Sequence, residues 1–142
     1  MTKMLTAKKG FTLLELLVVI SIIGILMAFG VVAYSTAQQK GRDAKRIADI
    51  KAMQNGFEQY ASAHSGLYAA CATMKADTSI FPGGAPVDPK TEPGDYDCVA
   101  NLTNNTYCIC AELDTAIGNA TASDCTGLGA TNGAYYCLTN LQ

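Results

Sequence analysis

Six cysteines offer this chain its clearest chemistry. They all lie beyond residue 70 of 142, at Cys71, Cys98, Cys108, Cys110, Cys125 and Cys137. Thiols of this kind form disulfides or hold a soft metal such as zinc. Only one residue separates Cys108 from Cys110, whereas common zinc sites place two to four residues between paired ligands. The even number, placed after an export-like segment, favours disulfides in an oxidising compartment and no bound cofactor.

A second group of candidate ligands is acidic. Four carboxylates fall in a loop-like stretch that holds all four prolines, at Asp88, Glu92, Asp95 and Asp97. Carboxylate oxygens are the ligands that calcium prefers. The four lack the regular spacing of a dedicated calcium loop, so we interpret them as solvated acidic turns and keep calcium as the alternative.

Catalytic groupings are hard to find in the sequence. His64 is the single histidine, and we can place no Ser-His-Asp or Cys-His arrangement and no phosphate-binding glycine loop. We interpret His64 as a packing or boundary residue. An exported enzyme held by a membrane anchor is therefore the disfavoured hypothesis, and the chain is predicted not to be an enzyme.

One carboxylate occupies an unusual place. Glu15 is the only charged side chain between Phe11 and Gln39, a stretch long and apolar enough to span a bilayer. Such a carboxylate costs roughly several kcal/mol unless it is paired. Basic residues precede it, at Lys3, Lys8 and Lys9. They place residues 1–10 in the cytoplasm by the positive-inside rule. An ordinary secretory signal has a shorter apolar stretch, and a plain anchor leaves Glu15 unexplained.

The residues around Glu15 resemble the processing site of type IV prepilins and pseudopilins. The stretch is KKGFTLLE, residues 8–15, directly before the membrane-length segment. The resemblance implies that a prepilin peptidase cuts between Gly10 and Phe11, and that Phe11 is then N-methylated. It also implies that Glu15 pairs with the terminal amine of a neighbouring subunit. The implied partners are further copies of the chain, the prepilin peptidase and methyltransferase, and an inner-membrane assembly platform.

A single helix from about Phe11 to His64 must carry this segment. Its first half is apolar all round, whereas its second half is amphipathic. The apolar stripe of the second half comprises Ile47, Ile50, Met53, Phe57, Tyr60 and His64. The charged residues are expected on the other faces, namely Lys40, Arg42, Asp43, Lys45, Arg46, Asp49, Lys51 and Glu58. Gly66 suits the end of the helix.

Three strands are predicted after the proline-rich loop, over residues 96–100, 106–113 and 134–140. The middle strand alternates, with one face made by Tyr107, Ile109, Ala111 and Leu113. The sequence thus predicts an α+β, pilin-like fold. One long amino-terminal helix, transmembrane in its first half, packs its second half on a small antiparallel sheet.

The pairing of the cysteines is open, because six thiols can combine in many ways. Cys108 and Cys110 lie two apart on one strand, near the limit for a bridge between them. If Cys71 pairs with Cys98, a nested arrangement suits two antiparallel strands. This arrangement joins Cys110 to Cys125 and Cys108 to Cys137.

Four segments follow from these patterns. Residues 1–10 are a cleaved leader, 11–39 the hydrophobic helix, 40–66 the amphipathic helix and 67–142 the disulfide-stapled loop and sheet region. The whole chain carries a formal net charge of −2, and loss of the three leader lysines makes it −5. An acidic body of this kind is a poor partner for nucleic acid.

The function predicted by the resemblance is structural. The chain is expected to enter the cytoplasmic membrane with its amino terminus in the cytoplasm, and then to join an extracellular or periplasmic filament. A subunit of a type IV pilus or related filament is the main hypothesis. The alternatives are a minor pilin or adhesin at a filament tip and a pseudopilin of a type II secretion system.

Overall fold

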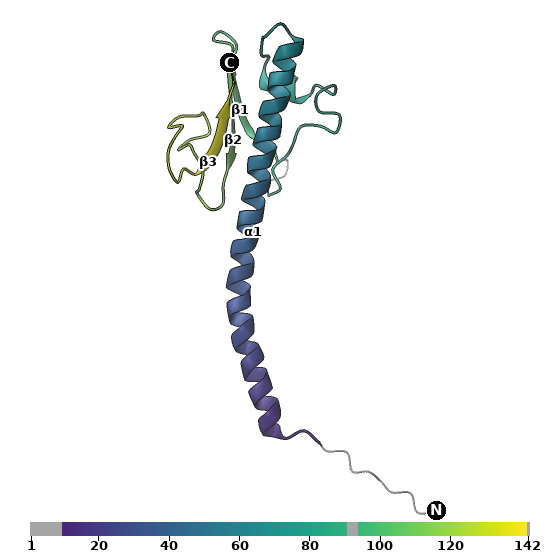
Figure 1. The fold of residues 1–142 in the computed structure, drawn as a ribbon, viewed down its shortest axis with the longest axis vertical. Helices are drawn as coiled ribbons and strands as arrows, with labels where there is room; N and C mark the ends of the chain where they lie inside the picture. Colours follow the sequence, from purple (N-terminus) through teal and green to yellow (C-terminus); the bar gives the residue numbers. More distant parts are fainter. Residues whose placement is uncertain (1–9, 91–93, 142) are drawn as a thin grey trace, which may run out of the picture. The chain divides into compact units, whose positions relative to one another are not determined.

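The structure, a computed structural model, describes residues 10–90 and 94–141. Two compact units make up the chain, divided after Ala37. The elements in chain order are α1 (Leu13–Ala63), α2 (Cys71–Lys75), β1 (Asp97–Asn101), β2 (Thr106–Glu112) and β3 (Tyr135–Thr139) (Figure 1). The predicted α+β fold with one long amino-terminal helix and a small sheet is confirmed, and the short helix α2 was not foreseen.

The sheet is antiparallel with the strand order β1-β2-β3. All three strands lie within about a residue of the predicted bounds. In the register of β2 and β3, Cys110 stands directly opposite Cys137, and Cys108 stands opposite Thr139. This register decides which thiols can meet.

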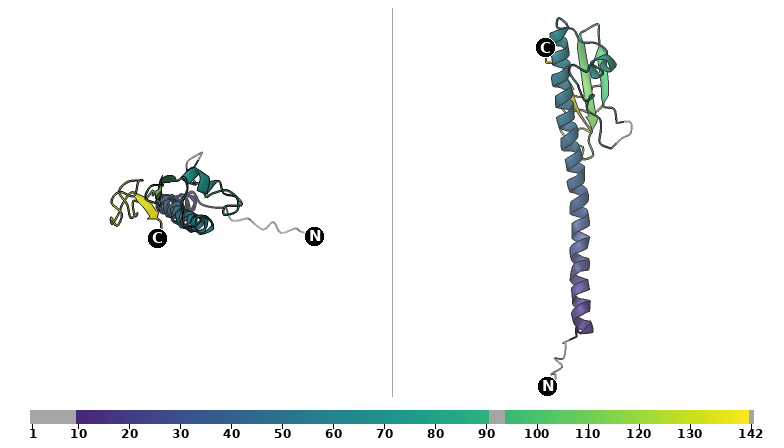
Figure 2. Two further views of the ribbon diagram at one scale, coloured as in Figure 1. Left: turned by 90° about the horizontal axis from the view of Figure 1, so that it is seen from above. Right: turned by 90° about the vertical axis from the view of Figure 1, so that its right-hand side faces the viewer.

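The main core lies between the sheet and the part of α1 beyond residue 37 (Figure 2). From the helix, Ile50, Met53 and Phe57 are fully buried. Phe57 meets the Tyr107 ring of β2 edge to face, with ring centroids 5.1 Å apart. The predicted apolar stripe is thus confirmed from Ile50 through Tyr60, whereas Ile47 is half-buried and lies outside the core cluster. His64 itself is exposed and stacks on Tyr60 at 3.9 Å, which agrees with a boundary role.

β2 is buried on both of its faces. Tyr107, Ile109 and Ala111 face the helix, as predicted from their alternation. Cys108 and Cys110 belong to a second buried cluster with Ala120 and Cys137. The alternation therefore located the helix-facing side correctly, but the opposite side is covered as well.

The long segment between β2 and β3 covers the face of β2 that points away from the helix. Ala120 forms a bridge to Tyr135, and the Asn119 side chain pairs with the backbone of Cys137. Its Nδ2 donates to the Cys137 carbonyl at 2.9 Å, and its Oδ1 accepts from the Cys137 N–H at 2.7 Å. The amide of Asn119 thus imitates a neighbouring strand and occupies this edge of the sheet.

Three disulfides staple residues 71–137. They join Cys71 to Cys98, Cys108 to Cys125, and Cys110 to Cys137. The conditional pairing of Cys71 with Cys98 is confirmed, whereas the nested pairing of the other four is wrong. Cys137 stands opposite Cys110 at a Cα–Cα distance of 4.1 Å. A link from Cys137 to Cys108 would have to run diagonally, over roughly 7–8 Å between Cα atoms.

Two glycines have structural roles at α1, one at the end of the helix and one inside it. Gly66 follows the helix with φ +81° and donates its N–H to the Ala61 carbonyl at 2.7 Å, so it ends the helix as predicted. Gly56 lies inside the helix, where a Cβ would stand 2.3 Å from Cζ of Phe81. The missing side chain lets the Phe81 ring pack on the helix.

Replacement of Gly56 therefore separates packing from helix propensity. We expect Gly56→Ala to destabilise the oxidised protein by about 1–3 kcal/mol, because the Phe81 ring must move. Gly41→Ala is the matched control, since its new Cβ meets nothing within 4 Å. It should stabilise α1 by up to about 1 kcal/mol. Chemical denaturation measures both, and a stabilised Gly56→Ala protein would contradict the packing described.

Candidate functional site

The start of α1 is built around Glu15. Thr12 precedes the first helical residue, and the Thr12 N–H and Oγ1–H both donate to Oε2 of Glu15, at 2.9 and 2.8 Å. The N–H of Glu15 donates back to Thr12 Oγ1 at 3.2 Å. This reciprocal pattern is a capping box, which satisfies backbone donors that a helix start leaves free.

The cap gives Glu15 a local role that the sequence analysis missed. The signal was present, since a threonine followed three residues later by glutamate before an apolar run is a helix-start signature. Both bonds from Thr12 end on Oε2, and Oε1 accepts no hydrogen bond from a described residue. One oxygen of the carboxylate is therefore used within the chain, and the other can accept a further donor.

The predicted processing residues lie just before this cap. Gly10 and Phe11 stand outside the helix, and Phe11 is 84% exposed. Gly10 is exposed and has open space around its Cα. Lys8 and Lys9 fall outside the described residues. The two residues that flank the predicted cut are thus sterically accessible, and cleavage there would leave Thr12 and Glu15 intact.

Large apolar side chains cover the surface of the part of α1 that belongs to the first compact unit of the chain. Leu13, Leu14, Ile20 and Phe29 are each more than half exposed, as are most of their apolar neighbours up to residue 34. Ser21 satisfies its hydroxyl by donating to the Leu17 carbonyl at 2.7 Å. By length and composition the helix can cross a membrane. An apolar surface of this size needs lipid or protein to cover it.

The second unit holds a buried charge cluster that the sequence analysis placed wrongly. Asp43 and Arg46 were expected on the outer faces of the helix, but both are buried. Asp43 accepts the N–H groups of Asp114 and Thr115 at 2.8 and 3.0 Å. Arg46 donates to Asp88 from two nitrogens, at 2.8 and 3.1 Å. Loop residues distant in sequence supply these partners, so helical periodicity could not reveal the burial.

The structure also assigns contacts to the candidate calcium ligands. Asp88, Asp95 and Asp97 line one cleft, together with Arg46 and Lys90. Asp88 is held by Arg46, and Asp95 accepts from Lys75 Nζ at 2.6 Å. Glu92 lies outside the described residues. Asp88 and Asp95 thus serve as ion-pair partners.

Asp114 is the acidic centre of this cluster. Lys90 Nζ lies 3.0 Å from its Oδ1, and Arg42 Nε donates to its Oδ2 at 2.7 Å. Burial by itself raises the pKa of Asp114. The hydrogen bonds from Lys90, Arg42 and Arg46 outweigh burial and hold this pKa well below its usual value of 3.8. The charged form of Asp114 is therefore favoured by the folded state.

Glu58 accepts a further set of hydrogen bonds within the second compact unit. Its carboxylate accepts the hydroxyls of Tyr68 and Tyr107, each at 2.8 Å, and the N–H of Leu141 at 3.1 Å. Burial and then the Glu58 carboxylate raise the pKa of Tyr68 to about 12. The helix, the middle strand and the carboxyl-terminal segment meet at this one side chain.

Comparison with known proteins agrees with the amino-terminal geometry. Residues 5–31 match the prokaryotic N-terminal methylation motif. The type II secretion system core protein G of Vibrio cholerae serotype O1 is 32% identical over 80 residues, which cover 56% of this chain and 45% of that protein. The protein of the same name from Escherichia coli K12 is 40% identical over 53 residues, or 37% of each chain. No solved structure matches significantly.

The motif and these relatives support an assignment to the type IV pilin and pseudopilin family. The chain spans less than half the length of the two curated relatives that it matches. The family is structural, and the motif that carries the match is the segment in which Gly10, Phe11, Thr12 and Glu15 lie. The motif match thus lies in the amino-terminal part of the chain.

The low pKa of Asp114 predicts a specific acid sensitivity. A group with a lowered folded pKa stabilises the protein above its unfolded pKa, and this contribution is lost as the pH falls further. We expect the free energy of unfolding to decrease as the pH drops below about 4. Asp114→Asn should remove about 3 kcal/mol at neutral pH, and less as the pH approaches 2.

The matched control is Glu112→Gln. Glu112 is exposed and forms no ion pair with a described residue, so its loss should change the free energy of unfolding by less than about 0.5 kcal/mol. Chemical denaturation at several pH values measures both proteins. A constant difference between Asp114→Asn and wild type from pH 7 to pH 2 would contradict the assigned role.

Proposed function

We propose that this chain is a structural subunit of a type IV pilus or related filament, which polymerises through the apolar first part of α1. The carrying observation is an exposed apolar helix that starts with a single carboxylate. In the membrane, lipid covers this surface before assembly. In a filament, the same surface packs against other copies of the chain.

Processing prepares the helix for assembly. A prepilin peptidase cuts between Gly10 and Phe11, and Phe11 is N-methylated on its new amine. The motif match over residues 5–31 and the exposure of both residues support this step. The cut removes the basic leader, and the helix cap between Thr12 and Glu15 survives because both residues follow the cut.

The new amine then needs a negative partner. A positive charge next to a helix amino terminus is unfavourable, because the helix dipole is positive at that end. Glu15 Oε1 accepts nothing from the described residues and is available to the amine of a neighbouring subunit. A buried carboxylate that is stabilised only by pairing would set the stagger between adjacent helices.

The cellular location of the subunit follows from the proposed processing and assembly. The subunit enters the cytoplasmic membrane with its amino terminus in the cytoplasm and its body outside. The assembly platform of the inner membrane then adds it to a periplasmic or extracellular filament. Three disulfides in the body suit an oxidising exterior.

A pseudopilin of a type II secretion system is the second candidate. Both relatives described above are named type II secretion system core protein G, and the longer similarity covers 80 residues, more than the amino-terminal motif. The two candidates differ in where the filament stands. Deletion of the gene should abolish surface fibres in one case and the export of folded proteins in the other.

Mass spectrometry of sheared filaments tests the proposal directly. We expect a chain that begins at Phe11, is one methyl group heavier than its sequence and has all six cysteines oxidised. Gly10→Val should leave the leader attached and the protein in the membrane, because a branched side chain would block the peptidase. Gly24→Ala, which meets nothing within 4 Å, should be processed normally. Wild-type chains that retain residues 1–10 would refute the proposal.

Glu15→Gln separates the two roles of this side chain. Glutamine can replace glutamate in a capping box but carries no charge to pair with an amine. We expect Glu15→Gln to keep the helix start and to reduce filament yield at least tenfold. Thr12→Val removes the cap, at a cost of about 1 kcal/mol, and should leave assembly largely intact. Normal filaments from Glu15→Gln would show that capping alone explains Glu15.

A further inference from the structure

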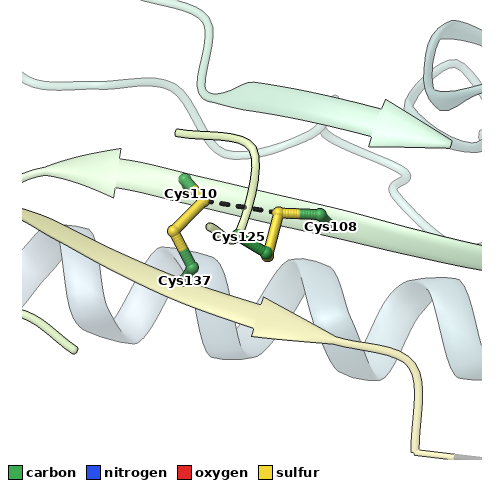
Figure 3. Close-up of side chains that lie close together, drawn as sticks. All are labelled: Cys108, Cys110, Cys125 and Cys137. Atoms are coloured by element: carbon green, nitrogen blue, oxygen red, sulfur yellow. Dashed lines mark hydrogen bonds between the residues drawn. A yellow bond between two sulfur atoms is a disulfide. The ribbon is translucent and has the colours of Figure 1, made fainter. Parts of the chain in front are cut away.

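The four sulfurs of two disulfides form one buried cluster. The Sγ atoms of Cys108, Cys110, Cys125 and Cys137 all lie within 4.8 Å of one another. Cys108 Sγ lies 3.5 Å from Cys110 Sγ, although each is bonded to a different partner. Figure 3 shows this contact as a dashed line between the two disulfides. Sulfurs at this distance are close enough for exchange between the bonds.

Cys125 is the most exposed of the four cysteines. Cys110 and Cys137 are completely buried, and Cys108 is 8% exposed. Cys125 is half-buried in the segment between β2 and β3. Its backbone has φ +64°, a left-handed conformation that is unfavourable for a non-glycine residue. Opening the Cys108–Cys125 bond would let Cys125 leave this conformation.

We propose that Cys125 is the entry point for thiol–disulfide exchange, and that Cys108 passes the exchange on to the buried Cys110–Cys137 bond. The partner is a dithiol, such as the active site of a thiol–disulfide oxidoreductase. Its thiolate attacks Cys125 Sγ, and the Cys108–Cys125 bond breaks with its electron pair on Cys108. The second thiol of the partner then releases Cys125 as a thiolate, and the partner leaves as a disulfide.

The relay step takes place inside the cluster. The Cys108 thiolate attacks Cys110 Sγ, and the Cys110–Cys137 bond breaks with its electron pair on Cys137. Once released from Cys125, the Cys108 side chain can rotate to line up with the Cys110–Cys137 bond, since its sulfur already lies 3.5 Å from Cys110 Sγ. The Cys137 thiolate takes up a proton, and the Ala122 carbonyl, 3.6 Å from this sulfur, accepts the new S–H. A second dithiol then reduces the Cys108–Cys110 bond through Cys108.

The test compares reduction rates in the full chain held in detergent micelles. Dithiothreitol is the probe, and acid quenching, alkylation and peptide mass spectrometry follow each disulfide. Cys108→Ser with Cys125→Ser removes the relay, and we expect reduction of Cys110–Cys137 to slow at least tenfold. The matched control, Cys71→Ser with Cys98→Ser, also removes one disulfide and should leave that rate unchanged or increase it.

The direction of the effect distinguishes the relay from simple loss of stability. Removal of a disulfide destabilises the fold, and easier unfolding would speed the reduction of Cys110–Cys137. An equal or faster rate without Cys108 and Cys125 overturns the proposal. Wild-type protein gives a second measurement that needs no variant. At early times, no chain should carry labels on Cys110 or Cys137 while Cys108–Cys125 is intact, and the appearance of such chains overturns it too.

Discussion

The folding of the second compact unit, residues 38–142, depends on other parts of the chain covering both faces of β2. The helix covers one face with a stripe of apolar side chains centred on Phe57. A helix and three short strands leave the other face of the sheet open, and the segment between β2 and β3 covers it. That segment has few large apolar residues of its own. The disulfides of Cys125 and Cys137 therefore hold this side of the sheet together by covalent bonds, which agrees with the need of small cores for staples.

The buried charged side chains of α1 fix how the loops pack against this helix. Asp43 and Arg46 leave solvent only because Asp88, Asp114 and Thr115 provide matched hydrogen bonds. Removing one partner would leave a buried charge unpaired, which costs far more than the pair contributes. The cluster thus tolerates one arrangement of the loops around the helix.

In the proposed filament, Glu15 would serve both the monomer and the contact between subunits. Within the chain, the carboxylate caps the helix through Thr12. A cap of this kind uses one oxygen, so the remaining oxygen can serve a neighbour without loss of the helix start. A residue that looks costly in an apolar segment is therefore partly satisfied before any assembly takes place. Under the proposed assembly, the same side chain would stabilise the helix start of the monomer and pair with the amine of a neighbouring subunit.

Local patterns in the sequence determined the long helix and the three strands of this protein. The apolar run, the stripe of Ile50, Met53 and Phe57, the alternation around Ile109 and the KKGFTLLE motif were sufficient to predict the helix, the strands, the helix-facing core and the family. The capping box was also readable, from the spacing of Thr12 and Glu15. The tertiary structure alone decided the burial of Asp43 and Arg46 and the partner of each cysteine around β2. Burial and disulfide pairing depend on residues that are distant in sequence, and strand register brings Cys110 opposite Cys137 only after the chain has folded.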